Sequence, residues 1–181
     1  MNTIAAAELA AFPSALASAG RSPEIPESDD IYGFLVGSWE LDIRVYWQDI
    51  SELNLKAEAH FGWVLEGRAI QDVWIIPRPE HRGSMPNPNI YAYGTTMRVY
   101  DPKLRAWHVT WINPVTGQRN ELTGRRIGND IVQIGALPDG TPIRWNFTEI
   151  TQNSFRWTGE TLQPDGHTWL LQGKFHAHRI R

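Results

Sequence analysis

The chain of 181 residues contains no cysteine. A disulfide framework, a thiol nucleophile and any zinc site with thiolate ligands are therefore excluded. The formal net charge is only −3, so the chain lacks the basic field that holds a phosphate backbone, and we expect no nucleic-acid partner. No apolar run reaches the roughly 18 residues of a membrane-spanning helix, so we expect no membrane partner.

The N-terminal part lacks the pattern of a packed domain. The alanine-rich segment Ile4–Ala19 follows no Lys or Arg and is interrupted by Glu8 and Pro13, so it reads poorly as a secretory signal and a cytoplasmic location is expected. Arg21–Asp30 carries two prolines and four acidic residues. We therefore expect residues 1–31 to be a short helical arm and a linker, and residues 32–181 to be one domain.

After this linker the apolar residues recur with a period of two, which is typical of strands. Trp39, Leu41, Ile43, Val45 and Trp47 alternate with polar residues and form the first predicted strand. Turn residues such as Pro-Asp-Gly and Gly-Asn-Asp separate the later ones. The further predicted strands are Leu53–Leu65, Ala69–Ile76, Tyr93–Tyr100, Leu104–Asn113, Arg119–Ile127, Ile131–Ala136, Ile143–Ile150, Phe155–Leu162 and Thr168–Ile180.

A meander of this length rarely stays an open sheet, because twist accumulates and closure removes the exposed edges. The sequence therefore predicts an all-β fold, an antiparallel up-and-down β-barrel of about ten strands. The segment Pro77–Ile90 has four prolines and is too long for a hairpin turn. We expect it to lie over one mouth of the barrel and to control ligand access.

Several segments carry a family resemblance. Gly37-Ser38-Trp39 resembles the Gly-X-Trp signature of lipocalins and the wider calycin superfamily, whose barrels enclose small apolar ligands. The resemblance implies that Arg179, near the end of the last strand, packs over Trp39. The chain also resembles a group of uncharacterised bacterial lipocalin-like proteins, in segments such as Met97–Pro102, Trp107–Trp111 and Pro164–Trp169. The glycine pattern of haem-binding nitrobindin-like barrels is absent, and no cofactor is expected.

Tryptophan is the strongest compositional signal, with nine residues. Trp39, Trp63, Trp107, Trp111, Trp145, Trp157 and Trp169 share the apolar parity of their strands. Two interpretations stay open, because the indoles could fill the core or line a cavity. Small residues on the inward parity favour a cavity; they are Ala57, Ala59, Gly159 and Gly173.

Few polar residues are candidates for contact with a ligand in the lumen. Asp72 stands in a stretch that is apolar on both faces, so it lies either inside as a buried carboxylate or on the surface. Alternation places Arg98 and Arg144 outside, whereas a polar side of the lumen would let them bind an anionic head group. The candidate ligand-binding residues are Trp47, Trp63, Asp72, Met97, Arg98, Trp107, Trp111, Arg144, Trp145 and Trp157.

Two functions fit this pattern. The first is binding of a small hydrophobic or aromatic molecule in the lumen. The alternative is a cofactor-independent lyase, isomerase or cyclase, with Asp72, His108 or Glu149 as acid or base. His176 and His178 share one face, but Lys174 beside them would repel a cation, so we expect no metal. The sequence does not determine the oligomeric state and allows a homodimer.

Overall fold

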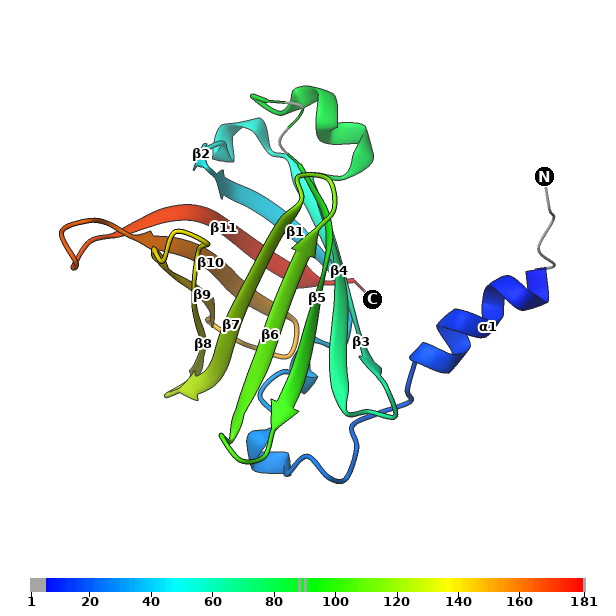
Figure 1. Ribbon diagram of the computed structural model, residues 1–181. Coiled ribbons are helices and arrows are strands. Elements are labelled where there is room, and N and C mark those ends of the chain that lie inside the picture. Colours follow the sequence, from blue (N-terminus) through cyan, green and yellow to red (C-terminus); the bar gives the residue numbers. More distant parts are fainter. Residues whose placement is uncertain (1–5, 88, 90, 181) are drawn as a thin grey trace.

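The computed structural model describes residues 6–87, 89 and 91–180, and it is an antiparallel β-barrel (Figure 1). Ten strands follow one another around the barrel, and the last pairs with the first to close it. The predicted all-β, up-and-down fold is confirmed. The strands are β1 (Gly37–Tyr46), β3 (Lys56–Val64), β4 (Ala69–Ile76), β5 (Ala92–Asp101), β6 (Ala106–Asn113), β7 (Gln118–Ile127), β8 (Asp130–Ala136), β9 (Pro142–Thr148), β10 (Ser154–Leu162) and β11 (Trp169–Arg179), with the two-residue β2 (Gln48–Asp49) beside β1.

The hairpins form at the predicted turn sequences. In the turn between β10 and β11, Asp165 Oδ1 accepts hydrogen bonds from the backbone amides of His167 and Thr168, and Gly166 has a φ of 72°. Such a positive φ favours glycine, because a side chain would crowd the backbone there. The Asp-Gly pair therefore sets the reversal of the chain, and the regular turns keep consecutive strands adjacent.

Closure of the barrel depends on the pairing of β1 with β11. Trp39 lies opposite Arg179, and Ile43 lies opposite Phe175. The guanidinium of Arg179 lies 4.2 Å from the centroid of a Trp39 ring and donates to the carbonyl oxygens of Val36 and Phe34. The arrangement that the resemblance implied for these two residues is therefore present.

Two bulges change the predicted parity. In β1, Arg44 is the extra residue between Ile43 and Val45, so Val45 points outward and Tyr46, opposite Gly173, points inward. In β11, Gln172 is the extra residue, because Gly173 pairs with Gly159 and Leu171 pairs with Glu160. The predicted alternation, which groups Val45 with Trp39, Leu41 and Ile43, is wrong at Val45 because of the bulge in β1.

The second bulge changes the side of the sheet on which Trp169 lies. It pairs with Leu162 beyond the extra residue and lies on the outer face. There the guanidinium of Arg144 stacks 4.2 Å from the centroid of its ring. An alternation counted along the chain cannot register an inserted residue, so the parity that holds for Gly173 and Phe175 is inverted before Gln172.

The linker closes one end of the barrel. Ile25, Ile31, Tyr32 and Leu35 are all at most 5% exposed and belong to the main hydrophobic core. Figure 1 shows this segment passing beneath the strand ends opposite β2. The acidic, proline-containing stretch contains the short 3₁₀ helix Glu27–Asp29 and no strand, and its apolar residues pack as a floor.

The N-terminal helix α1 (Ala6–Leu16) projects away from the barrel (Figure 1). It is joined to the barrel at its C-terminal end, where Ala17 bridges Val64 and the amide of Ser18 donates to the carbonyl of Trp63. The predicted helical arm is present. Residues 1–5, with Ile4 of the predicted segment, lie outside the described residues.

The proline segment lies beside the open end of the barrel and is fixed to β3. It contains the short 3₁₀ helix Pro79–Ser84. The Lys56 amide donates to Nδ1 of His81 at 2.9 Å, and the Arg78 amide donates to the Lys56 carbonyl at 2.8 Å. Pro88 and Ile90, part of the predicted gate, lie outside the described residues.

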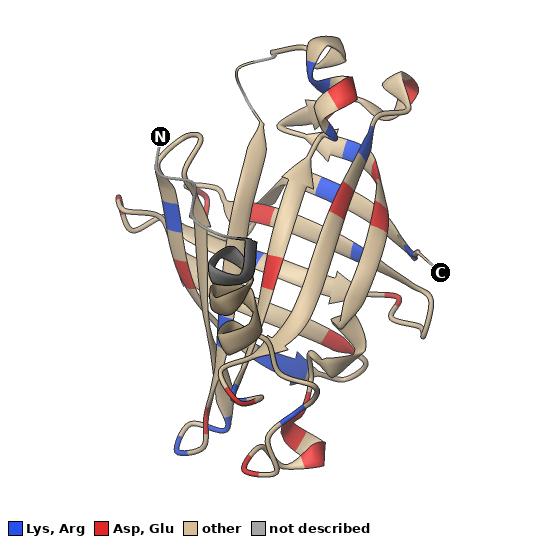
Figure 2. Ribbon diagram, turned by 90° about the vertical axis from the view of Figure 1, so that its right-hand side faces the viewer, with Lys and Arg blue, Asp and Glu red and all other residues tan. Residues whose placement is uncertain are grey.

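The outer surface is charged and self-paired. Figure 2 shows acidic and basic residues on neighbouring strands of the side that it faces. Arg78 pairs with Glu40 and Glu58, and Lys56 pairs with Glu40 and Asp42. The strands thus present charged residues to the solvent and apolar residues to the interior, as is typical of an antiparallel sheet with one solvated face.

Candidate functional site

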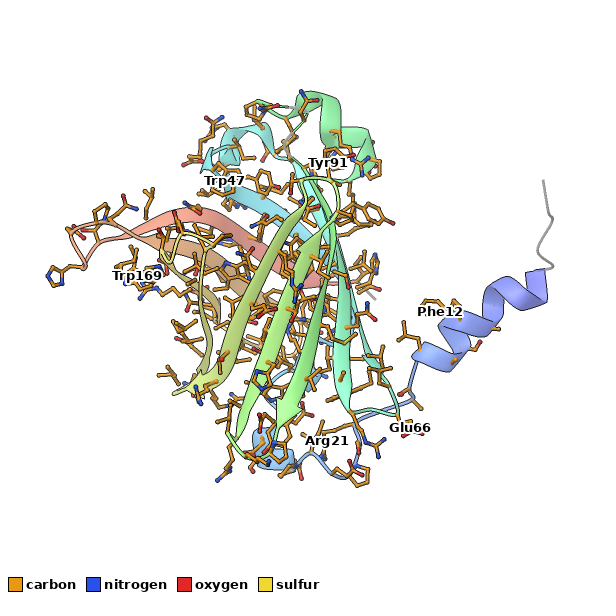
Figure 3. All side chains as sticks on the ribbon, in the orientation of Figure 1. Phe12, Arg21, Trp47, Glu66, Tyr91 and Trp169 are labelled. Carbon is orange, nitrogen blue, oxygen red and sulfur yellow. The ribbon has the colours of Figure 1, made fainter. Side chains whose placement is uncertain are left out.

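A cavity of about 490 Å³ opens at the end of the barrel that carries Trp47. Figure 3 places Trp47 beside β2, at the end opposite Arg21 and Glu66. Aromatic side chains dominate its wall. They are Tyr46, Trp47, Trp74, Trp111, Trp145, Trp157 and Phe175.

The indoles lie over glycines of neighbouring strands. A Cβ atom at Gly94 would come within 2.5 Å of Cη2 of Trp111, and one at Gly173 within 2.9 Å of Cζ3 of Trp157. Both distances are far below van der Waals contact, so only glycine lets these indoles lie flat along the wall. The small inward residues predicted at Gly159 and Gly173 therefore give space to the rings, and the rings leave a cavity between them.

Trp157 is at the centre of the aromatic cluster. Its ring lies 5.3 Å from the centroid of Phe175, 5.8 Å from Trp145 and 5.9 Å from Trp74. These separations fall within the range of favourable aromatic pairs. The cluster forms a continuous aromatic surface that a flat ligand could contact.

The cavity wall also contains polar residues. They come from β5, β6, the turn after β6, β7 and the bulge of β11, and they are Thr96, Arg98, Asn113, Thr116, Gln118 and Gln172. Of these, only Arg98 carries a charge. A mostly apolar pocket with a few placed polar groups is the common form of a small-molecule site.

Arg98 lies inside the barrel, which corrects the outward position expected from alternation. It is 2% exposed and pairs across the sheet with Ile70, and its Nη1 atom lies 2.5 Å from Oδ2 of Asp72. Asp72 is 1% exposed. The ion pair explains the inversion, because each charge compensates the other in a site where neither could remain alone.

Both oxygen atoms of Asp72 are occupied. Oδ2 receives Arg98, and Oδ1 accepts the backbone amide of Thr96 at 2.6 Å. Asp72 itself does not line the cavity, whereas Arg98 and Thr96 do. The carboxylate therefore supports Arg98 from behind.

Tyr46 is the other ionisable side chain in the wall. Burial raises the pKa of its phenol to about 12. Tyr46 is therefore neutral at physiological pH, and it offers a hydroxyl that can donate or accept a hydrogen bond.

The structure brings together some of the predicted ligand-binding residues and separates others. The cavity wall contains Trp47, Arg98, Trp111, Trp145 and Trp157. Trp63 and Trp107 are buried outside the wall, and the indole of Trp107 donates to the Asp29 carbonyl in the linker at 2.9 Å.

Met97 and Arg144 lie on the outer face. Met97 pairs with Gln71, and Arg144 pairs with Glu160 at 2.5 Å. For Arg144 the outward position expected from alternation holds, and the inward alternative is wrong.

Two of the candidate catalytic residues also point away from the lumen. His108 is on the outer face, with Nε2 3.0 Å from Asp101 Oδ2. Glu149, with a φ of 51°, lies in the turn between β9 and β10 and pairs with Arg156 at 2.7 Å. Asp72 alone of the three lies inside the barrel.

Sequence reasoning missed several wall residues, and Tyr46 and Trp74 are the two with the clearest cause. Strict alternation from Trp39 puts Tyr46 outside, because the bulge at Arg44 is not visible in the sequence. Trp74 shares the parity of Asp72, and the apolar residues on both faces of β4 hid which parity is internal. Had Asp72 been placed inside, Trp74 would have followed two residues later.

Among the described residues, no group of three or more His, Asp or Glu side chains could hold a metal ion. No helix in the described part of the chain is long and apolar enough to cross a membrane.

In comparisons with known proteins, no family model matches the chain, and no curated protein matches its sequence.

Proposed function

We propose that the protein binds a small aromatic or apolar molecule in the cavity of its barrel. The observation that carries this proposal is the cavity of about 490 Å³ with its wall of indoles. Pockets for small molecules commonly measure about 300–1,000 Å³ and are mostly apolar. A core meant only for stability would be filled at close-packed density instead of leaving such a space.

The ionisable groups favour binding over the alternative of a lyase, isomerase or cyclase. Among the described residues, the wall contains only Arg98 and Tyr46 as ionisable side chains. An arginine stays protonated and Tyr46, with a pKa of about 12, stays neutral, so neither exchanges a proton readily at neutral pH. Acid–base chemistry thus has little support in this cavity.

The proposal also includes the family to which the barrel belongs. We infer a lipocalin-like barrel of the calycin type, supported by Trp39, by the arginine stacked on it and by the closed ten-strand barrel. The cytoplasmic location and the homodimer that the sequence allows stay predictions.

The test is a titration with N-phenylnaphthylamine, a neutral aromatic probe that accepts energy from nearby tryptophans. We expect saturable energy transfer with one probe bound per chain. Trp47→Ala should raise the dissociation constant about three- to tenfold, because it removes one aromatic contact at the mouth. Trp47 is 57% exposed, so the variant should fold normally.

Trp169→Ala is the matched control, because this indole lies on the outer face and should not affect the dissociation constant. A probe panel that gives no saturable signal would overturn the proposal. Equal effects of Trp47→Ala and Trp169→Ala would show binding outside the cavity and would overturn it as well.

A further inference from the structure

The Asp72–Arg98 pair makes the cavity electrically neutral although an arginine lines it. We propose that the ligand is uncharged and presents a hydrogen-bond acceptor, such as a carbonyl oxygen, to Arg98, and that Asp72 is the positioning residue that sets this selectivity. The inference rests on the proposed function and specifies the class of ligand.

The charge balance of the cavity is the first argument. Arg98 is the only charged residue in the wall among the described residues, and Asp72 lies directly behind it at 2.5 Å. Arg98 is otherwise surrounded by rings, at 5.1 Å from the centroid of Tyr32, 5.6 Å from Phe61 and 5.9 Å from Phe147. An anionic ligand would leave one negative charge uncompensated in this apolar setting, and a cationic ligand would leave one positive charge.

The unused donors of Arg98 are the second argument. A guanidinium has five N–H donors and no acceptor. Asp72 takes one of them through Nη1, and the Nε atom is buried without a hydrogen-bond partner, so a ligand reaches only the terminal N–H groups of Arg98 that face the cavity. These groups offer donors beyond the one that Asp72 takes but no net charge, which suits an acceptor on a neutral ligand.

The position of Asp72 is the third argument. Its oxygens bind Arg98 and the Thr96 amide, and it does not reach the cavity. It cannot contact the ligand, so its effect on binding must pass through Arg98. Removing only its charge should therefore convert a neutral site into a cationic one without altering the shape of the wall.

The test compares three ligands of one shape by calorimetry at neutral pH. Naphthamide is neutral with a carbonyl acceptor, naphthoate is its anionic analogue, and naphthylmethylamine is its cationic analogue. We expect naphthamide to bind at least about tenfold more tightly than either charged analogue, because each of these buries an uncompensated charge.

Asp72→Asn tests whether the charge of Asp72 causes the preference for the uncharged ligand. Asparagine keeps the shape and an oxygen for the Thr96 amide, but leaves the charge of Arg98 uncompensated. We expect naphthoate to bind about tenfold more tightly than to the natural protein and to overtake naphthamide. In Asp72→Asn/Arg98→Met this gain should disappear, because the cation is gone.

Asp42→Asn is the control, because Asp42 forms its ion pair with Lys56 on the outer face. It should leave the order of the three ligands unchanged. The order of the three affinities is measured on the natural protein without any variant. It therefore tests the preference for an uncharged ligand even where a variant does not fold.

The outcomes separate the two proposals. Equal affinities for the three ligands, or tighter binding of naphthoate by the natural protein, would overturn this inference while aromatic binding stands. An unchanged order in a folded Asp72→Asn variant would overturn the role of Asp72. If none of the three ligands binds, the proposed function fails together with the inference.

Discussion

At the scale of single residues, the central feature is one buried ion pair between the cavity and the core. Asp72 and Arg98 are at most 2% exposed, and their charged atoms are 2.5 Å apart. Burying two charges costs solvation, so such a pair contributes little net stability, although either charge alone would be costly. We therefore interpret the pair as serving the site more than the fold.

This interpretation predicts a non-additive effect on stability. Arg98→Met should lower the free energy of unfolding by about 3–5 kcal/mol, because Asp72 is left buried without its partner. Asp72→Leu/Arg98→Met should lower it by less than Arg98→Met alone. Urea unfolding measures both; equal losses in the single and double variants would contradict the prediction.

At the scale of elements, the linker before β1 acts as part of the barrel. Asp29 receives hydrogen bonds from Tyr100 Oη and from the Arg105 guanidinium at 2.8 Å, while its carbonyl accepts the indole of Trp107 at 2.9 Å. One residue of an irregular segment thus joins β5, β6 and the turn between them. Its composition indicated a linker, but its contacts with distant strands could not be read from it.

These contacts predict a pH dependence. Hydrogen bonds from Arg105 and Tyr100 lower the pKa of Asp29 to about 2, so the unfolded chain takes up its proton more readily than the folded one. The stabilisation by Asp29 should be complete above the ordinary aspartate pKa of about 3.9 and should be lost as the pH falls through about 2.

Asp29→Asn should accordingly flatten the change in urea midpoint between these two pH values. Glu121→Gln, which alters an ion pair on the exposed outer face, is the control and should not flatten it. If Asp29→Asn kept the slope of the natural protein, the assignment of this pH dependence to Asp29 would be wrong.

The strands themselves were predictable at this scale. β4 has the predicted bounds, and most others differ from the predicted bounds by one or two residues at one or both ends. The strand predicted over Leu53–Leu65 is shorter, because Ser51–Leu53 forms a 3₁₀ turn and β3 begins at Lys56. Alternation and turn residues are local signals, so the chain itself carries them.

At the scale of the whole molecule, Arg179 joins the last strand of the barrel to the segment before the first strand. Its guanidinium donates to the carbonyl oxygens of Phe34, Val36 and Gln152 at 2.6–2.9 Å, and it stacks on Trp39. The last strand, the segment before the first strand and the turn before β10 therefore meet at one side chain. The planar fork of arginine is suited to several such contacts at once.

Arg179→Met should lower the free energy of unfolding by about 2–4 kcal/mol, because three charge-assisted hydrogen bonds and the stacking contact are lost. Arg179→Lys should not restore it, since an ammonium group cannot make the same fork. Arg119→Met on the exposed outer face is the control. Full stability of Arg179→Lys would show that the charge alone is sufficient.

The local pattern of the chain predicts the all-β class, the antiparallel order of the strands and most of the inward-facing indoles, because period and turn chemistry are properties of neighbouring residues. Contacts between strands establish which indoles line a cavity, that Tyr46 faces inward after a bulge, and that Arg98 lies inside. Bulges shift the phase of a strand when it pairs, and a buried arginine is tolerated only where a carboxylate from another strand meets it. Both conditions arise between strands, so the pattern within one strand could not reveal them.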